Sequence, residues 1–221
     1  MTNDGWFDGL TIKRAADQGG KLVDPSLLVI HYTAGASFQS DLAELTRADE
    51  RPASAHFLVG RDGELAQLVA MNRVAYHAGK SHWKGRDNCN RFSIGIEVSN
   101  WGPFVQRGGK FYAWPGDFRR TVVHDSRVVL AKHPNSRCEY RAWEHYSGAC
   151  LSTLFDLVVR VCLELPSIKE IVGHQDVSPG RKIDPGPALD LRLLRKAVEQ
   201  ARTPKEITPC DSCKTTESLP G

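Results

Sequence analysis

Gly173-His174-Gln175-Asp176-Val177-Ser178-Pro179-Gly180-Arg181-Lys182-Ile183-Asp184-Pro185-Gly186 is the stretch that decides how the rest of the chain is interpreted. It follows a short apolar run, residues 168–172, of the kind that forms a buried strand. Its prolines and glycines oppose a continuous helix, because proline lacks a backbone donor and clashes with the preceding turn. We therefore predict an ordered loop that leaves a strand, which is a common location for catalytic groups.

The histidine and the second aspartate of this loop suit a metal site. His174 lies at the expected strand end, and Asp184 follows ten residues later. A neutral imidazole and a carboxylate are two of the three protein ligands of an open catalytic zinc site. A second apolar run, residues 27–30, ends in His31. A single histidine at a strand end is more often a packed residue than a ligand, but two neighbouring strands that both end in histidine favour a site. We predict one Zn²⁺ per chain on His31, His174 and Asp184.

Two further charged residues complete a hydrolytic site. Glu97 lies within residues 93–100, which alternate apolar residues as a central strand does. A glutamate is rarely buried without a partner or a function, although an exposed edge position would also explain it. Lys182 lies two residues before Asp184 and would otherwise be interpreted as a surface lysine. Zinc lowers the pKa of water towards about 7 and polarises a carbonyl, so Glu97 would be the base and Lys182 the oxyanion stabiliser of an amide hydrolysis.

The remaining pattern predicts an α/β single domain with a mixed central β-sheet flanked by helices. Residues 55–59 and 64–69 flank an Asp-Gly turn and predict a hairpin, in which we interpret His56 as a core residue. Helices are expected at three places, and a second small hairpin at a fourth. These are residues 38–49 (capped by Ser37 or Ser40), 147–165 and 188–201 for the helices, and residues 104–106 with 110–114 for the hairpin.

Composition gives limits on function. The 221 residues are 41% hydrophobic and 25% charged with a net charge of +3, as in an ordinary globular protein. No basic and aromatic array suggests nucleic-acid binding, and no segment has the apolar length of a membrane span. We expect a monomer that is cytoplasmic, because the first residues do not form a signal peptide, unless a phage releases it or it is injected. Most of the six cysteines should be reduced.

Four separated motifs resemble one known family. They are His31-Tyr32-Thr33-Ala34, Tyr76-His77-Ala78-Gly79, Cys89-Asn90-Arg91-Phe92-Ser93-Ile94-Gly95-Ile96-Glu97, and the loop of residues 173–186. In this order they are similar to zinc-dependent N-acetylmuramoyl-L-alanine amidases of the AmpD type, in the amidase-2 and peptidoglycan-recognition-protein superfamily. Aspartate as the third ligand resembles the AmpD branch. We expect a lead-in (1–24), a zinc amidase domain (25–202), which the resemblance covers, and a polar, flexible tail (203–221).

The resemblance implies an activity and a set of roles. It implies hydrolysis of the amide between N-acetylmuramic acid, or its 1,6-anhydro form, and the L-alanine of the stem peptide, in peptidoglycan or muropeptides. Zinc would lie on His31, His174 and Asp184, with Glu97 and Lys182 as catalytic groups. His77, Arg181, Tyr32 and Trp83 are the expected substrate contacts. The alternative is a peptidoglycan-binding module without activity, and the sequence leaves open whether the protein recycles muropeptides or acts as an endolysin or secreted effector.

Overall fold

A computed structural model describes residues 1–48, 50, 53–113, 122–135 and 137–203. The tail expected to be flexible, with Cys210 and Cys213, lies outside the described residues from position 204 onward. The proposed boundaries at residues 24 and 202 stay predictions.

The main sheet is mixed and has six strands in the order β1-β4-β3-β7-β2-β13. Its β3 and β4 form the predicted antiparallel hairpin, and the other neighbouring strands run parallel. The strands are β1 (Thr11–Ile12), β2 (Leu27–Tyr32), β3 (Phe57–Val59), β4 (Leu65–Gln67), β7 (Ser93–Val98) and β13 (Glu170–Gly173). This confirms the predicted mixed α/β architecture.

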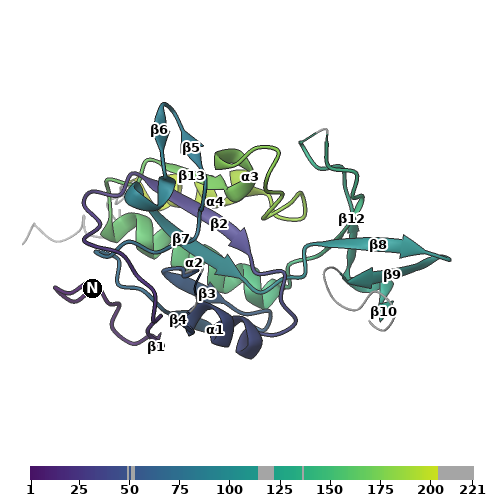
Figure 1. Cartoon of the computed structure of the whole chain (residues 1–221), viewed down its shortest axis with the longest axis horizontal. Coiled ribbons are helices and arrows are strands. Elements are labelled where there is room, and N and C mark those ends of the chain that lie inside the picture. The colour runs from purple at the N-terminus through teal and green to yellow at the C-terminus, as the bar shows by residue number, and fades with distance from the viewer. Residues whose placement is uncertain (49, 51–52, 114–121, 136, 204–221) are drawn as a thin grey trace, which may run out of the picture.

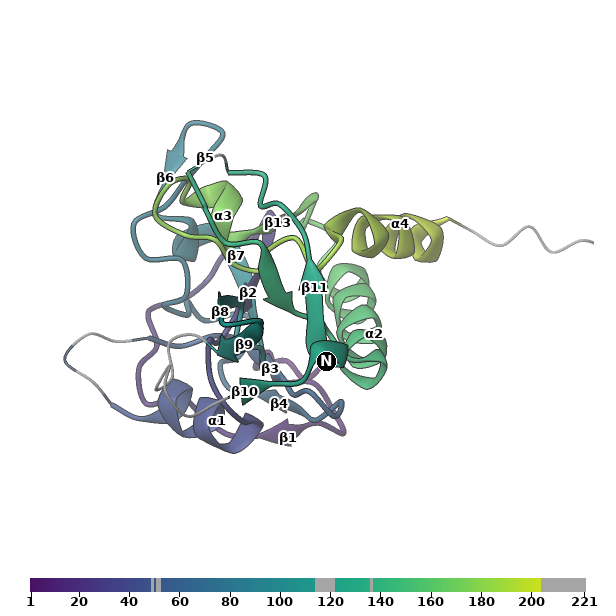
Figure 2. The ribbon, with the colours of Figure 1, turned by 90° about the vertical axis from the view of Figure 1, so that its right-hand side faces the viewer.

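Helices cover the sheet, and the hydrophobic core lies between them and the strands. The long helix α2 (Gly148–Glu164) and α4 (Leu191–Arg202) pack together against one face (Figure 2). Helix α1 (Phe38–Thr46) begins at Ser37, one of the two predicted caps, and ends three residues before the predicted end. The short helix α3 (His174–Val177) lies inside the loop of residues 173–186, where we expected irregular backbone. The predicted long helix of residues 147–165 is confirmed, with Ser147 as its cap.

Successive side chains of the strands face opposite sides of the sheet, so the large core cluster and the candidate site lie on different faces. Leu28 and Ile30 of β2 point into the large cluster that α2 and α4 cover. Leu27 and Val29 point to the opposite face, where they pack beneath α3 and the 3-10 helix η1 (Cys89–Phe92). Because successive side chains of a strand face opposite sides, His31 lies on the second face. Helices α2 and α4 therefore lie on the face opposite to His31.

A second sheet is the main departure from expectation. Where we predicted a small hairpin, five strands form an antiparallel sheet in the order β10-β9-β8-β12-β11. Figure 1 shows it standing apart from the core, on the side toward which the arrowhead of β2 points. Its strands are β8 (Pro103–Arg107), β9 (Lys110–Ala113), β10 (Val122–Val123), β11 (Val128–Leu130) and β12 (Ala142–Glu144), with the 3-10 helix η2 (Asp125–Arg127) before β11. A separate small hairpin pairs β5 (His82–Trp83) with β6 (Arg86–Asp87).

One buried carboxylate ties the second sheet to the first. Glu144 is 2% exposed and accepts two bonds from Arg61, at 3.0 Å from Nε and 2.9 Å from Nη2. Arg127 and the backbone N–H of Trp101 also donate to it. A buried acid that is matched by several donors resists displacement, because breaking any one contact leaves a desolvated charge. The second sheet is thus held in one position against the β3–β4 hairpin.

Phe7 and Leu22 of the expected lead-in belong to the core. Within the described residues, Cys89, Cys138, Cys150 and Cys162 are free thiols, as expected. None of the helices that the structure describes combines the length and the apolar character that a membrane crossing requires.

The fold predicts a strong position effect along α2. Leu154 is fully buried in the core cluster, whereas Leu163 on the same helix is 50% exposed. Leu154→Ala should lower the free energy of unfolding by about 2–5 kcal/mol, because it removes buried apolar surface and leaves a cavity. Leu163→Ala, the matched control, should change it by less than about 0.5 kcal/mol. Urea unfolding measures both, and equal losses would contradict the assignment of the buried face.

Candidate metal centre

The site lies where three neighbouring parallel strands end. Gly173 of β13 is in register with Ile30 of β2, so His174 and His31 follow at the same level. His31 is in turn paired with Glu97 of β7. Carboxyl ends of parallel strands are the usual binding edge of an open α/β sheet. The register alone therefore aligns two predicted ligands and the predicted base in one row.

Three ligand atoms converge at this edge. His31 Nδ1 lies 2.9 Å from His174 Nδ1, and Asp184 Oδ2 lies 3.1 Å from the former and 3.0 Å from the latter. All three residues are buried, at 1%, 3% and 5% exposure. Four ligands about 2.05 Å from a zinc ion in a tetrahedron would stand about 3.3 Å apart. The observed triangle is close to one face of such a tetrahedron.

Hydrogen bonds behind the rings determine which nitrogen carries the proton. His174 Nε2 lies 3.0 Å from the carbonyl oxygen of Ala78 and must donate to it. For His31, the assignment follows a chain of contacts. Ser93 Oγ donates to the carbonyl of Cys89 at 2.6 Å, so it accepts from His77 Nε2 at 3.2 Å. His77 Nδ1 is then an acceptor, and His31 Nε2 donates to it at 2.9 Å.

In both ligand histidines, therefore, Nδ1 carries a lone pair. Burial lowers the pKa of His31 to about 4, which keeps the ring neutral. Burial by itself raises the pKa of Asp184. His174 and His31 nevertheless hold this pKa well below its usual value, so the carboxylate is ionised. Two lone pairs and a carboxylate oxygen facing one another at about 3 Å repel unless a cation lies between them. The donor set fits a metal ion with nitrogen and oxygen ligands.

Glu97 lies beside the triad without belonging to it. Its Oε1 is 3.9 Å from His31 Nδ1. Its Oε2 is buried and has no hydrogen-bond partner among the residues that the structure describes. Burial, with the charge of Asp184 adding, raises the pKa of Glu97 to about 8, and Lys182 opposes this rise. A carboxyl that titrates near neutral pH suits both uptake and release of a proton.

Backbone carbonyls hold the loop that carries Asp184. The carbonyl of Asp184 accepts from the N–H of Gln175 at 2.8 Å. The carbonyl of Ile183 accepts from His133 Nε2 at 3.1 Å, and that of Pro185 accepts from the Tyr146 hydroxyl at 2.9 Å. The carbonyls of residues 183, 184 and 185 are thus all hydrogen-bonded. Two of the donors come from the segment of the second sheet (His133) and from just after its strand β12 (Tyr146). This mounting keeps Asp184, and Lys182 two residues before it, in place.

His133 is a positioning residue to which the sequence analysis assigned no chemistry. It is 1% exposed, and its ring stacks on Trp143 with centroids 5.5 Å apart. The Trp143 ring in turn packs on Gly186, where an added Cβ would lie 2.8 Å from the ring. Neither residue shows a motif spacing that would have identified it, because the contacts span 43 to 50 positions of the chain.

The expected substrate contacts lie in different surroundings. His77 is 8% exposed, and both of its ring nitrogens are engaged behind His31. Arg181 is exposed, and its Nη2 donates to the carbonyls of Ala78 and Lys80. Tyr32 is half-buried, packs against Gly102, and has its pKa raised by burial. Trp83 Nε1 donates to Glu170 at 3.2 Å, away from the triad. His77 contacts the ring of His31, and Arg181 Nη2 lies 3.2 Å from Nε2 of His174. The substrate roles of all four residues stay predictions.

Lys182 is half-buried, and its positive charge acts on the candidate metal centre. Its ammonium lowers the pKa of both His31 and Glu97. The structure thus brings Lys182, Glu97 and the three candidate ligands together, as the sequence analysis expected of one site.

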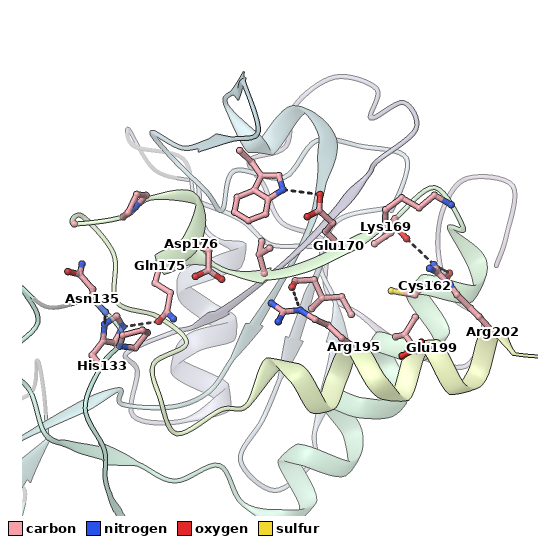
Figure 3. Close-up of a pocket in the computed structure, with 18 of the residues that line it drawn as sticks. His133, Asn135, Cys162, Lys169, Glu170, Gln175, Asp176, Arg195, Glu199 and Arg202 are labelled. Atoms are coloured by element: carbon pink, nitrogen blue, oxygen red, sulfur yellow. Dashed lines mark hydrogen bonds between the residues drawn. The ribbon is translucent and has the colours of Figure 1, made fainter.

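A large cavity in the described residues does not include the triad. It has a volume of about 1240 Å³ and runs along the free edge of β13, between α3, α4 and residues 133–135 and 137 (Figure 3). A smaller cavity of about 630 Å³ lies between β8, residues 137–142 and Ile183. The smaller one borders the catalytic loop through Ile183, between Lys182 and Asp184.

The contact between His77 and His31 predicts an effect on metal affinity. His77→Ala removes the acceptor that fixes the His31 tautomer, so Zn²⁺ should bind about 10- to 100-fold more weakly. Ser93→Ala, which leaves the ring in place but removes its support, should have a smaller effect in the same direction. Competition with a chromogenic chelator measures the affinity. His82→Ala, whose side chain is 59% exposed, is the control. Unchanged affinity in both test variants would refute the assignment of the hydrogen-bond chain.

Solved structures of other proteins share this fold. A solved structure of a selenomethionine derivative of AmpD superposes with a TM-score of 0.62 at 25% identity, over 90% of this chain and 99% of that one. A complex of the amidase AmiD from E. coli with anhydro-N-acetylmuramic acid-L-Ala-D-gamma-Glu-L-Lys gives a TM-score of 0.58 at 28% identity, over 84% of this chain and 60% of that one.

Sequence relatives and a family profile identify the group. The 1,6-anhydro-N-acetylmuramyl-L-alanine amidase AmpD of Escherichia coli K12 is 30% identical over 150 residues, which are 68% of this chain. The match covers 61% of that relative, less than two thirds of its length. The profile of the Amidase_2 family, described as N-acetylmuramoyl-L-alanine amidase, matches residues 21–187. The chain therefore belongs to the N-acetylmuramoyl-L-alanine amidase family Amidase_2.

Proposed function

We propose that this protein hydrolyses the amide between N-acetylmuramic acid, or its 1,6-anhydro form, and L-alanine of the stem peptide, with one Zn²⁺ bound by His31, His174 and Asp184. The observation that carries the proposal is the convergence of three lone pairs within 3.1 Å beside the unpartnered Oε2 of Glu97. Family membership and the muropeptide in the AmiD complex support the choice of substrate.

The roles of the side chains follow from their positions. Zn²⁺ bound by two histidines and a carboxylate acts as a Lewis acid towards a carbonyl oxygen and towards water. Glu97 takes the proton of the attacking water, because its carboxylate lies beside the three ligands and its buried Oε2 has no partner among the described residues. The same carboxyl then gives the proton to the nitrogen of L-alanine as the carbon–nitrogen bond breaks. The charge of Lys182 stabilises the oxyanion that forms on the carbonyl.

Substitution of the proposed base separates catalysis from metal binding. Glu97→Ala should lower kcat by at least about 100-fold, because no other group takes over the proton transfer. Zinc content should stay near one per chain, since Glu97 is not a ligand. Mass spectrometry of muropeptide cleavage, together with elemental analysis of the same sample, measures both. Turnover close to that of the wild type would remove Glu97 from the mechanism.

Removal of the metal tests the site itself. Dialysis against a chelator should abolish cleavage, and addition of one equivalent of Zn²⁺ should restore it. Asp184→Ala should bind Zn²⁺ with much lower affinity, because it removes one of the three converging donors. A wild-type protein that binds zinc and muropeptide but cleaves nothing would be a recognition module instead of an enzyme.

The choice between soluble and polymeric substrate determines the biological role. We propose to compare initial rates on soluble anhydro-muropeptides and on intact sacculi, with released peptides counted by mass spectrometry. A strong preference for soluble fragments would support recycling in the cytoplasm. A preference for sacculi would support action in the cell wall, as expected of an endolysin or an injected amidase.

A further inference from the structure

The cavity along β13 is a built feature that the proposed reaction does not use. One wall consists of α4, from which Arg195, Glu199 and Arg202 project into it (Figure 3). The opposite end is formed by Gln175, Asp176, Pro179 and Gly180, which belong to the loop that carries Asp184. The cavity therefore begins at the outer surface of the catalytic loop and leads away from it along the sheet edge.

Hydrogen bonds fix the walls of this cavity. Arg202 Nη2 donates to the carbonyls of Cys162 and Ile168, at 2.7 and 3.0 Å. His133 Nε2 lies 2.8 Å from Gln175 Oε1, so the amide nitrogen of Gln175 remains as a donor toward other groups. Trp83 is held by its bond to Glu170. Such a cavity is preformed, so a ligand would not have to order it.

Charge balance excludes a strongly ionic ligand. The cavity is lined by the cations Arg137, Lys169, Arg195 and Arg202 and by the anions Glu170, Asp176 and Glu199. Two of the basic groups are already engaged with the protein, Arg195 with the carbonyl of Ile171 and Arg202 with those of Cys162 and Ile168. A polyanion would need an excess of free basic groups, which this lining does not offer.

The sheet edge also disfavours an added peptide strand. Arg195 Nε donates to the carbonyl of Ile171 in β13 at 2.9 Å, so its side chain lies across the strand edge. A side chain placed over an edge strand is a common obstacle to strand addition. An extended peptide would have to displace this arginine before it could pair with β13.

A neutral, hydroxyl-rich chain satisfies the remaining constraints. Trp83 offers an aromatic surface, and Asn135, Gln175 and Asp176 offer planar amide and carboxylate groups near the catalytic loop. Planar polar groups of this type form paired hydrogen bonds with hydroxyl and acetamido groups. A volume of about 1240 Å³ exceeds the usual range of about 300–1,000 Å³ for small-molecule sites and leaves space for several sugar rings.

We propose that this cavity binds the neutral glycan strand of polymeric peptidoglycan, at sugar residues beyond the one whose peptide is cleaved. The inference rests on the proposed amidase function and specifies its substrate as a chain longer than one muropeptide unit. Glu199 on α4 and Trp83 on β5 both line the site, and both contact the strand.

Binding of a neutral oligosaccharide tests the site without catalysis. The probe is the hexamer of N-acetylglucosamine, which has the glycan backbone but no peptide or carboxylate. Isothermal titration should show saturable binding to the wild-type chain. Trp83→Leu, which keeps apolar packing, and Glu199→Ala should each weaken binding about fivefold. Gln200→Ala, one position further on α4 and outside the cavity lining, is the matched control and should bind like the wild type. Absence of saturable binding, or equal binding by all variants, overturns the proposal.

Kinetics separate this proposal from the amidase function. The ratio of kcat/KM for peptide-bearing glycan strands to kcat/KM for one muropeptide should fall about fivefold in Trp83→Leu and Glu199→Ala but not in Gln200→Ala. An unchanged ratio in active variants refutes the glycan site alone. A wild-type protein that cleaves neither substrate refutes the amidase function, and the glycan site as proposed fails with it.

Discussion

The convergence of two imidazole lone pairs and one carboxylate oxygen is the constraint on which the rest of the site depends. These atoms come from residues 31, 174 and 184, and each distance between them is near 3 Å. Groups of this kind repel one another in a buried place unless a cation satisfies them. The surrounding structure must therefore hold these three atoms together. Contacts on the face of the main sheet that carries His31 serve that purpose.

Support for the ligands extends outward through contacts of increasing distance. His31 rests on His77, and His77 on Ser93. Gly95 makes this possible, because an added Cβ there would lie 2.4 Å from the His77 ring. Another tie joins the ends of the strands. Asp41, which is 4% exposed, accepts from Thr33 at 2.9 Å and from Ser99 at 2.6 Å. One carboxylate thereby connects the segments that follow His31 and Glu97.

Much of the centre could be predicted from the sequence because its geometry follows from local patterns. Apolar runs ending at His31 and His174 give parallel strands, and parallel strands align their ends. Glu97 is identified by the same reasoning, as a charge within an apolar strand. The mixed sheet and the helix at residues 147–165 follow from periodicity in the same way.

Other features depend on contacts that no local pattern encodes. The second sheet consists of short strands with many polar residues, so periodicity suggested only one hairpin. The position of His77 depends on a hydrogen bond to Ser93, 16 residues further along the chain, and on the missing side chain of Gly95. His133 supports a carbonyl 50 positions away. Such contacts arise from tertiary packing between residues far apart in the sequence, so no local pattern predicts them.

The bonds to the carbonyls of residues 183, 184 and 185 have a consequence for how this family can vary. Every residue type has a backbone carbonyl, so this mounting does not depend on which side chains the loop carries. Ile183, whose side chain lines the smaller cavity, can change without loss of the bond to His133. Side chains of the very loop that holds the ligand can thus vary, while Asp184 remains in register with His31 and His174.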